Sequence, residues 1–170
     1  EHLQRLGRRH EVGPPLRGRA CAARVAARGD RPEELVLVER NSKLRHFGGF
    51  LAFPGGTLDP EDEAVPVSGL EDPEKARFIV AGARELFEET GIWLGKGGES
   101  PSHDELVRDR RQLLAEEISF KALLEKQGQH LDSRDLVPLC RITTPAFSPI
   151  RFDTLFLRGF VPNDTTVEVW

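Results

Sequence analysis

The chain has 170 residues, a formal net charge of −4 and 38% hydrophobic residues. This size and apolar content suffice for one globular domain with a hydrophobic core, and the mild acidity argues against nucleic acid as a partner. The sequence has no apolar run of membrane-spanning length, and its two cysteines lack the spacing of a metal site or a disulfide framework. We therefore expect a cytoplasmic protein that binds neither nucleic acid nor membrane.

The first segments predict an arm followed by strands. Residues 1–18 are basic and rich in Arg and His, so we expect an irregular solvated arm, with nucleic-acid binding as the alternative interpretation. A domain would then occupy residues 19–170. Apolar residues 20–27 and the β-branched run 35–38, with a turn between them, predict an antiparallel strand pair.

A third short strand is expected over residues 50–53, and it leads into a glycine turn. Gly55 and Gly56 stand in tandem after Pro54. Because glycine adopts backbone conformations closed to other residues, such a turn lets the main chain approach a ligand closely. A plain turn without a ligand is the alternative interpretation.

The next strong signal is a helix. Asp72 and Pro73 form a helix start, with Asp72 as N-cap, and Gly91 is a typical stop after Thr90. The expected buried stripe consists of Ile79, Ala83, Leu86 and Phe87.

Three carboxylates lie on the other face of this helix. Glu85, Glu88 and Glu89 stand at i, i+3 and i+4, so their side chains project from one face and repel one another. A hard divalent cation, Mg²⁺ or Mn²⁺, would relieve this repulsion because it prefers carboxylate oxygen. A solvated acidic stripe is the alternative interpretation.

The second half of the chain predicts a short strand, helices and further strands. Residues 92–94 are expected to form a strand, and residues 103–128 have helical spacing and are interpreted as an insertion, either a lid or a structural helix pair. Strands are also expected over residues 136–142 and 151–160. Residues 165–170 begin another strand, so we expect the C-terminal end of the domain to be incomplete.

The order of Gly56 and the segment from Arg84 to Ile92 resembles the Nudix box, which is glycine, a loop, then Arg-Glu-apolar-x-Glu-Glu-x-Gly-apolar. The resemblance implies an α/β Nudix fold, an α/β/α sandwich with a mixed β-sheet, in which Arg84 orients the first metal-binding glutamate and the Gly56 carbonyl helps hold the metal. The family has a glutamate eight residues before the arginine, where this chain has Ala76, and the span from Gly56 to Arg84 is twice the family length. The candidates to replace that glutamate are Asp59, Asp62, Glu63 and Glu74.

A second resemblance concerns the substrate. Arg40, Arg45, Gly49 and the segment Phe53-Pro54-Gly55-Gly56 are similar to the signature of the coenzyme A diphosphatase branch of this family. The resemblance implies coenzyme A or its esters as substrate and a substrate-binding role for Arg40, Arg45, Phe53 and Gly55. A guanidinium matches phosphate oxygens geometrically, although each arginine could instead be solvated or paired with a carboxylate.

The expected reaction is metal-dependent hydrolysis of a diphosphate bond in a small nucleotide-type substrate, with Arg84, Glu85, Glu88 and Glu89 as catalytic residues. The general base is left open between a glutamate of the box and Asp153. Two alternatives stand beside coenzyme A: another nucleoside diphosphate linked to a moiety X, such as ADP-ribose or a dinucleotide, and a catalytically silent Nudix module. The oligomeric state is also open, with a homodimer among the options.

Overall fold

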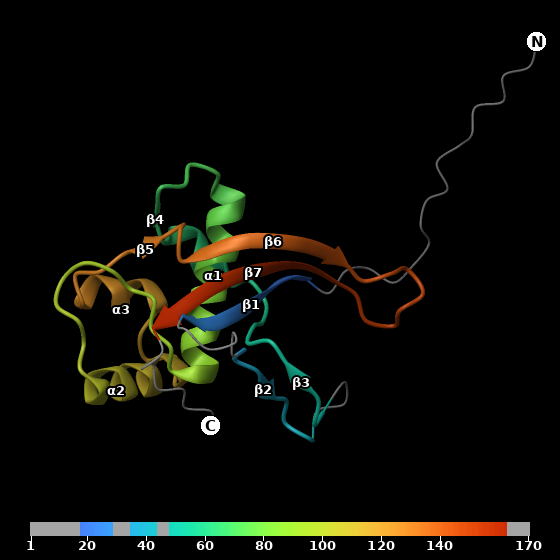
Figure 1. Ribbon diagram of the computed structural model, residues 1–170, viewed down its shortest axis with the longest axis horizontal. Coiled ribbons are helices and arrows are strands. Elements are labelled where there is room, and N and C mark those ends of the chain that lie inside the picture. Colours follow the sequence, from blue (N-terminus) through green and yellow to red (C-terminus); the bar gives the residue numbers. More distant parts are fainter. Residues whose placement is uncertain (1–17, 29–34, 44–47, 163–170) are drawn as a thin grey trace, which may run out of the picture.

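The computed structural model describes residues 18–28, 35–43 and 48–162 (Figure 1). Its elements in chain order are β1 (Gly18–Arg28), β2 (Val38–Glu39), β3 (Leu51–Ala52), the 3-10 helix η1 (Pro60–Ala64), β4 (Val67–Ser68), α1 (Pro73–Thr90), α2 (His103–Leu114), α3 (Phe120–Lys126), β5 (Leu131–Asp132), β6 (Leu136–Thr143) and β7 (Phe152–Pro162). None of the described helices is long and apolar enough to cross a membrane.

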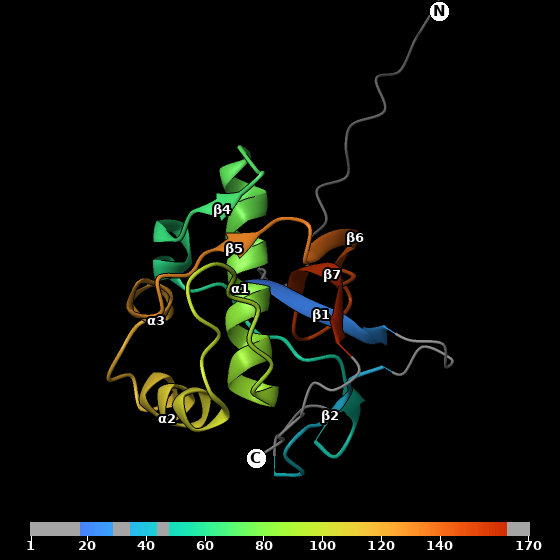
Figure 2. The same cartoon turned by 60° about the vertical axis from the view of Figure 1, so that its left-hand side comes forward.

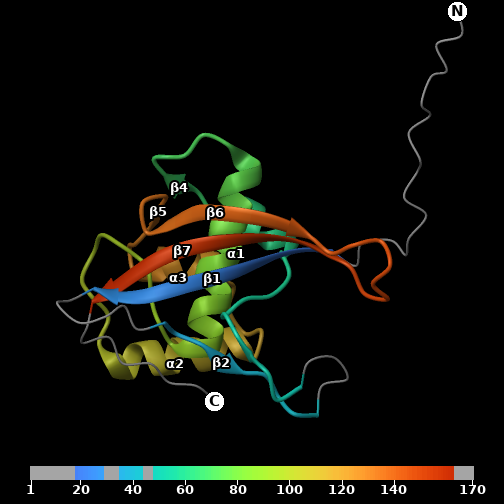
Figure 3. The same ribbon diagram turned by 45° about the vertical axis from the view of Figure 1, so that its right-hand side comes forward.

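The largest sheet has the order β1-β7-β6, and Figure 3 shows these strands side by side in front of α1. Strand β7 runs parallel to β1 and antiparallel to β6, so the expected mixed sheet is confirmed. Strand β2 pairs with β3 in an antiparallel hairpin, and β4 pairs with β5 in parallel. The described ladders therefore replace the antiparallel pairing predicted between residues 20–27 and 35–38, because β1 takes its partner from the far end of the chain.

Helix α1 lies between the sheet and the other helices. In Figure 2 the three-stranded sheet lies on one side of α1, while α2, α3 and η1 lie on the other. The predicted stripe is buried, and contact on two sides also buries Phe78, Val80 and Ala81. Gly82 allows the close approach of the sheet, because a Cβ there would lie 2.5 Å from Leu157 Cδ1 on β7.

The ends of α1 fall where the sequence predicts them. The Asp72 side chain accepts hydrogen bonds from the backbone N–H groups of Glu74 and Lys75, at 3.0 and 3.2 Å. At the other end Gly91 has φ = 73°, a left-handed conformation that favours glycine, and its N–H donates to the Phe87 carbonyl. These caps define the helix that carries the three candidate glutamates.

Residues 103–128 contain the helices α2 and α3, joined by a short linker. The side chains of Leu113, Phe120, Leu123 and Leu124 are buried and join the main core. At the α2–α3 contact, the buried carboxylate of Asp109 accepts hydrogen bonds from Lys126 Nζ at 2.5 Å and Gln127 Nε2 at 2.8 Å. The helix pair is thus a packed part of the domain.

Two further predictions need correction, and a third concerns residues outside the described ranges. Residues 92–94 form no strand, because Trp93 packs edge-on between Phe87 and Phe120 and donates its indole N–H to Gln129. The polar residues 59–69, between the glycine turn and α1, predict a loop, but the segment contains η1 and β4. The strand expected over residues 165–170 falls outside the described residues.

Candidate active site

The guanidinium of Arg84 is the centre of a carboxylate cluster on α1. Its Nη1 donates to Glu85 Oε1 at 3.0 Å and lies 3.3 Å from Glu88 Oε2. Its Nη2 donates to the backbone carbonyl of Thr57 at 3.0 Å, in the loop that follows the glycine turn. Arg84 therefore fixes the two glutamates relative to each other and ties them to that loop.

A third carboxylate, that of Asp62 on η1, binds Arg84 from the other side. Arg84 Nε donates to Asp62 Oδ1 at 3.1 Å, and Nη2 donates to Oδ2 at 3.2 Å, a two-pronged charge-assisted contact. Asp62 is only 3% exposed, and its Oδ2 also accepts the backbone N–H of Asp59 at 2.7 Å. Among the four acidic candidates for the missing box glutamate, Asp62 is the one that contacts Arg84 in the described structure.

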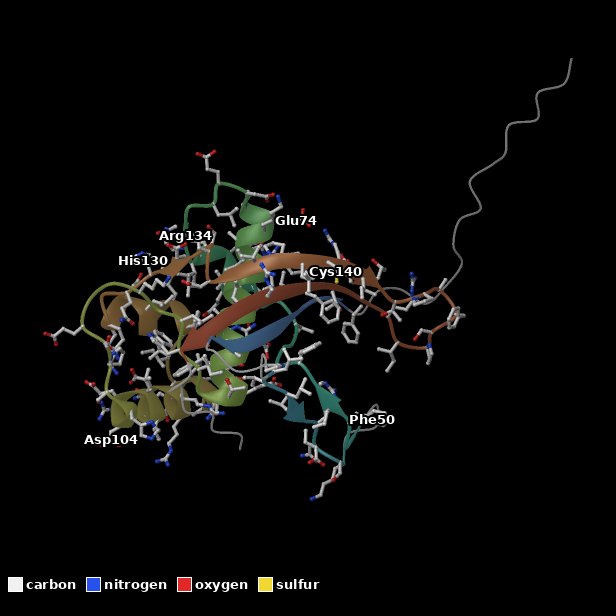
Figure 4. All side chains as sticks on the ribbon, viewed as in Figure 1. Phe50, Glu74, Asp104, His130, Arg134 and Cys140 are labelled. Atoms are coloured by element: carbon white, nitrogen blue, oxygen red, sulfur yellow. The ribbon has the colours of Figure 1, made fainter. Side chains whose placement is uncertain are left out.

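The other three candidates have different partners. Asp59 caps η1 by accepting the Glu61 N–H at 2.8 Å, and Glu63 pairs with Arg77 at 2.6 Å on the surface. Glu74 lies at the opposite end of α1, as Figure 4 shows, where it pairs with Arg141.

Counting forward from the glycine would have singled out Asp62. In the family, the span from the glycine to the arginine is half as long as in this chain. The acid that lies eight residues before the arginine therefore lies six residues after the glycine. Asp62 stands six residues after Gly56. The extra residues of this chain lie between Asp62 and Arg84, so counting backward from Arg84 leads to Ala76 instead.

The glycine turn lies directly against the glutamates. The Gly55 N–H donates to Glu89 Oε2 at 3.0 Å. A Cβ added to Gly56 would lie only 2.3 Å from Glu85 Oε1, so no larger residue fits there while Glu85 keeps its position. The structure thus brings Gly55, Gly56, Glu85, Glu88 and Glu89 together at one end of α1.

Burial raises the pKa of all three glutamates. The pKa of Glu88 rises to about 7, because partial burial disfavours its charge more than the nearby Arg84 favours it, and Glu85 adds repulsion. Burial likewise raises the pKa of Glu85, against the attraction of Arg84, and of Glu89, against the Gly55 hydrogen bond. Burial also opposes the charge of Arg84, but the bonds from Asp62 hold its pKa above the ordinary value.

The excess of negative charge suits a cation. Asp62, Glu85 and Glu88 all contact Arg84, which balances only one of their charges. Glu89, the next residue of α1, adds a further carboxylate. Among the described residues no three such side chains already converge as metal ligands, because their oxygens are turned toward Arg84 and the Gly55 N–H. By donor type and charge, the set nevertheless matches a hard divalent cation that prefers carboxylate oxygen.

Some of the candidate substrate-binding residues lie near this cluster. Arg40 is exposed at the end of β2, and its charge opposes the pKa rise of Glu89, which places it within electrostatic reach of the site. Phe53 is half-buried and precedes the glycine turn. Arg45 lies outside the described residues.

Asp153, the second candidate general base, lies away from the cluster. It forms a two-pronged ion pair with Arg141, which also contacts Glu74 in the first turn of α1. Glu74 and Glu88 are separated by about 20 Å along the helix at 1.5 Å per residue. The structure therefore argues against Asp153 as a base for chemistry at Glu85, Glu88 and Glu89.

A cleft of about 600 Å³ opens beside Arg84, Asp62 and Glu88. Its opposite wall comes from the end of α2, the α2–α3 linker and the start of α3, and includes Leu113, Glu116, Ile118 and Lys121. The helix pair therefore forms one wall of this cleft, and a role as a lid stays a prediction.

Comparison with known proteins gives relatives and a fold. No family model matches the sequence. The chain is 26% identical over 135 residues to a Caenorhabditis elegans protein with nudix hydrolase 7 in its name, and this match covers 79% of the chain and 42% of that protein. It is 41% identical over 54 residues, or 31% of its length, to a Yersinia enterocolitica protein with Nudix hydrolase NudL in its name, of which it covers 28%.

The crystal structure of a NUDIX hydrolase from Alicyclobacillus acidocaldarius superposes with a TM-score of 0.75 at 29% identity, over 90% of this chain and 73% of that one. The fold is therefore the Nudix fold. The chain spans less than half the length of each of the two curated relatives that it matches.

Proposed function

Because its relatives and its fold support the Nudix hydrolase family, we propose that this chain is a divalent-metal-dependent hydrolase of a nucleoside diphosphate linked to a second moiety. The observation that carries the proposal is the cluster at the end of α1. There Arg84 holds Glu85, Glu88 and Asp62, while the glycine turn holds Glu89.

In this reaction a water molecule attacks one phosphorus atom, a P–O bond of the diphosphate bridge breaks, and the bridging oxygen leaves with the other phosphate. Glu85, Glu88, Glu89 and the Gly56 carbonyl would hold Mg²⁺ or Mn²⁺. When bound, such an ion neutralises the negative charge that develops on the phosphoryl oxygens.

The chain's own residues arrange this chemistry. Asp62 orients Arg84, and Arg84 holds Glu85 and Glu88 at fixed positions. One of the three glutamates takes the proton of the attacking water, since a carboxylate held within this cluster can act as a general base. Fixed hydrogen bonds in a partly buried site also reduce the reorganisation needed during the reaction.

For the substrate we propose coenzyme A or an acyl-coenzyme A, with 3′,5′-ADP and (acyl-)phosphopantetheine as products. The support is the signature from Arg40 to Gly56 and the position of Arg40 within electrostatic reach of Glu89. ADP-ribose and dinucleotides contain the same diphosphate bridge and are the closest rivals.

A silent Nudix module that only binds a ligand is the second candidate function. The retained set of Arg84, Glu85, Glu88 and Glu89 argues against it, because ligand binding alone does not require three clustered carboxylates. The cost of burying these charges is visible in their raised pKa values.

A substrate panel tests the proposal. Coenzyme A, dephospho-coenzyme A, an acyl-coenzyme A, ADP-ribose and a dinucleotide would each be incubated with Mg²⁺ or Mn²⁺, with products identified by mass. The proposal predicts 3′,5′-ADP from coenzyme A as the fastest reaction. A preference for ADP-ribose would refute the coenzyme A assignment and keep the diphosphate chemistry, whereas no cleavage with either metal would favour the silent module.

A further inference from the structure

The last turn of α1 has a partner outside the proposed catalytic set. The final carbonyl groups of a helix have no partner within the helix and must find one elsewhere when they are buried. The Phe87 carbonyl accepts the Gly91 N–H. The Glu88 carbonyl accepts two hydrogen bonds from Arg110 of α2, from Nε at 2.9 Å and from Nη2 at 2.7 Å.

Arg110 is suited to a fixed contact of this kind. The residue is only 2% exposed, and its guanidinium meets the negative end of the α1 dipole. Because the guanidinium is planar and presents its donors as a rigid fork, two bonds to one oxygen fix the direction of approach as well as the distance. A lysine in the same place would supply a charge without that fork.

The helix that carries Arg110 is itself anchored. Its neighbour Asp109, also 2% exposed, binds Lys126 of α3 and Gln127, the C-cap of that helix. Leu113 of the same helix packs into the core. Consecutive residues of α2 thus reach in two directions, Asp109 to α3 and Arg110 to the turn that carries Glu88 and Glu89.

We infer that Arg110 is a positioning residue of the active site, acting through the backbone of Glu88. Without its two bonds the Glu88 carbonyl loses its buried charged donor, the last turn of α1 loosens, and the carboxylates of Glu88 and Glu89 lose their fixed placement. The helix pair α2–α3 is then a structural part of the catalytic centre. This inference rests on the proposed function, since it concerns the placement of the proposed metal ligands.

Variants of the full chain test the role of Arg110. Arg110→Met removes the donors and keeps most of the volume, Arg110→Lys keeps the charge without the fork, and Arg110→Ala leaves space for an added guanidinium ion. The matched controls are Arg108→Met, at an exposed position of the same helix, and Asp109→Asn, which weakens the contact with α3 and leaves the bond to Glu88 in place.

The measurements are the affinity for Mn²⁺ by electron paramagnetic resonance, kcat and KM at a temperature well below unfolding, and amide hydrogen exchange in the last turn of α1. We expect Arg110→Met to weaken Mn²⁺ binding and lower kcat by about 10- to 100-fold, as is usual when a residue that orients a metal ligand is lost, with little change in KM. Exchange in residues 88–91 should become faster. In Mn²⁺ affinity and kcat, Arg110→Lys should lie between the wild-type chain and Arg110→Met. Millimolar guanidinium should partly restore kcat in Arg110→Ala but should have no such effect on Asp109→Asn.

Two results separate the possible failures. If the wild-type chain binds Mn²⁺ and cleaves its substrate, and Arg110→Met matches Arg108→Met in Mn²⁺ affinity and kcat, Arg110 only stabilises the fold and the inference is overturned. If the wild-type chain binds no Mn²⁺ and cleaves no diphosphate, the proposed function is overturned, and the positioning role of Arg110 with it.

Discussion

Replacing Asp62 by asparagine should show that this residue supports the active site as the missing box glutamate would. The carboxylate accepts two charge-assisted bonds from Arg84 and one from the Asp59 N–H, and it is 3% exposed. Removing one partner of a buried ion pair costs about 3 to 5 kcal/mol. Arg84 keeps Glu85, Glu88 and the Thr57 carbonyl as partners, so we expect a lower cost of about 2 to 3 kcal/mol.

Urea unfolding of the metal-free protein measures this cost as a shift in the free energy of unfolding. Glu63→Gln is the matched control, because Glu63 lies one residue further along and forms a surface pair with Arg77 worth less than about 1 kcal/mol. Turnover should also fall in Asp62→Asn, since Arg84 is then free to move Glu85 and Glu88. Equal stability and equal turnover in the two variants would refute the role given to Asp62.

Two further predictions concern the glutamates. In metal-free protein the stability should fall by up to about 2 kcal/mol as the pH rises from about 4.5 to about 7, since Glu88 keeps its proton in the folded state, where its pKa is about 7, and loses it in the unfolded state. Glu88→Gln should flatten the dependence of the free energy of unfolding on pH in this range, as measured by urea unfolding. An unchanged slope in Glu88→Gln would count against the raised pKa of Glu88. Gly56→Ala should displace the Glu85 side chain, whose oxygens lie 2.3 and 2.5 Å from the new Cβ, so kcat should fall by about tenfold or more while the melting temperature changes little. Wild-type kcat in that variant would show that Glu85 can move without consequence.

Local signals in the sequence predict α1 well. Asp72, Pro73 and Gly91 act within one turn of the residues that they cap, so a short stretch of sequence contains the whole cause. The same holds for the apolar spacing of α2 and α3 and for the long strands β6 and β7. The boundaries of α1 and the face that carries the glutamates could therefore be predicted before the fold was known.

Contacts between distant segments could not be predicted in this way. The parallel pairing of β1 with β7 joins residues more than 130 positions apart, and no local pattern near residues 20–27 indicates it. Residues 92–94 have strand-like composition, but the packing of Trp93 between two phenylalanines decides their conformation. Arg110 has the same appearance in the sequence as the solvated charges around it, and only the helix packing shows that it is buried.

The most direct test of the central claim compares wild-type protein with Glu89→Gln in a diphosphate hydrolysis assay with Mg²⁺, Mn²⁺ or a chelator. Glu89 suits this test because it accepts the Gly55 N–H and makes no contact with Arg84 among those described, so the amide can keep the hydrogen bond while the charge is lost. We expect cleavage by the wild-type chain that stops in chelator, and turnover lowered by about 100-fold or more in a folded Glu89→Gln. Cleavage that continues in chelator, or full activity in Glu89→Gln, would contradict the proposed metal-dependent hydrolysis.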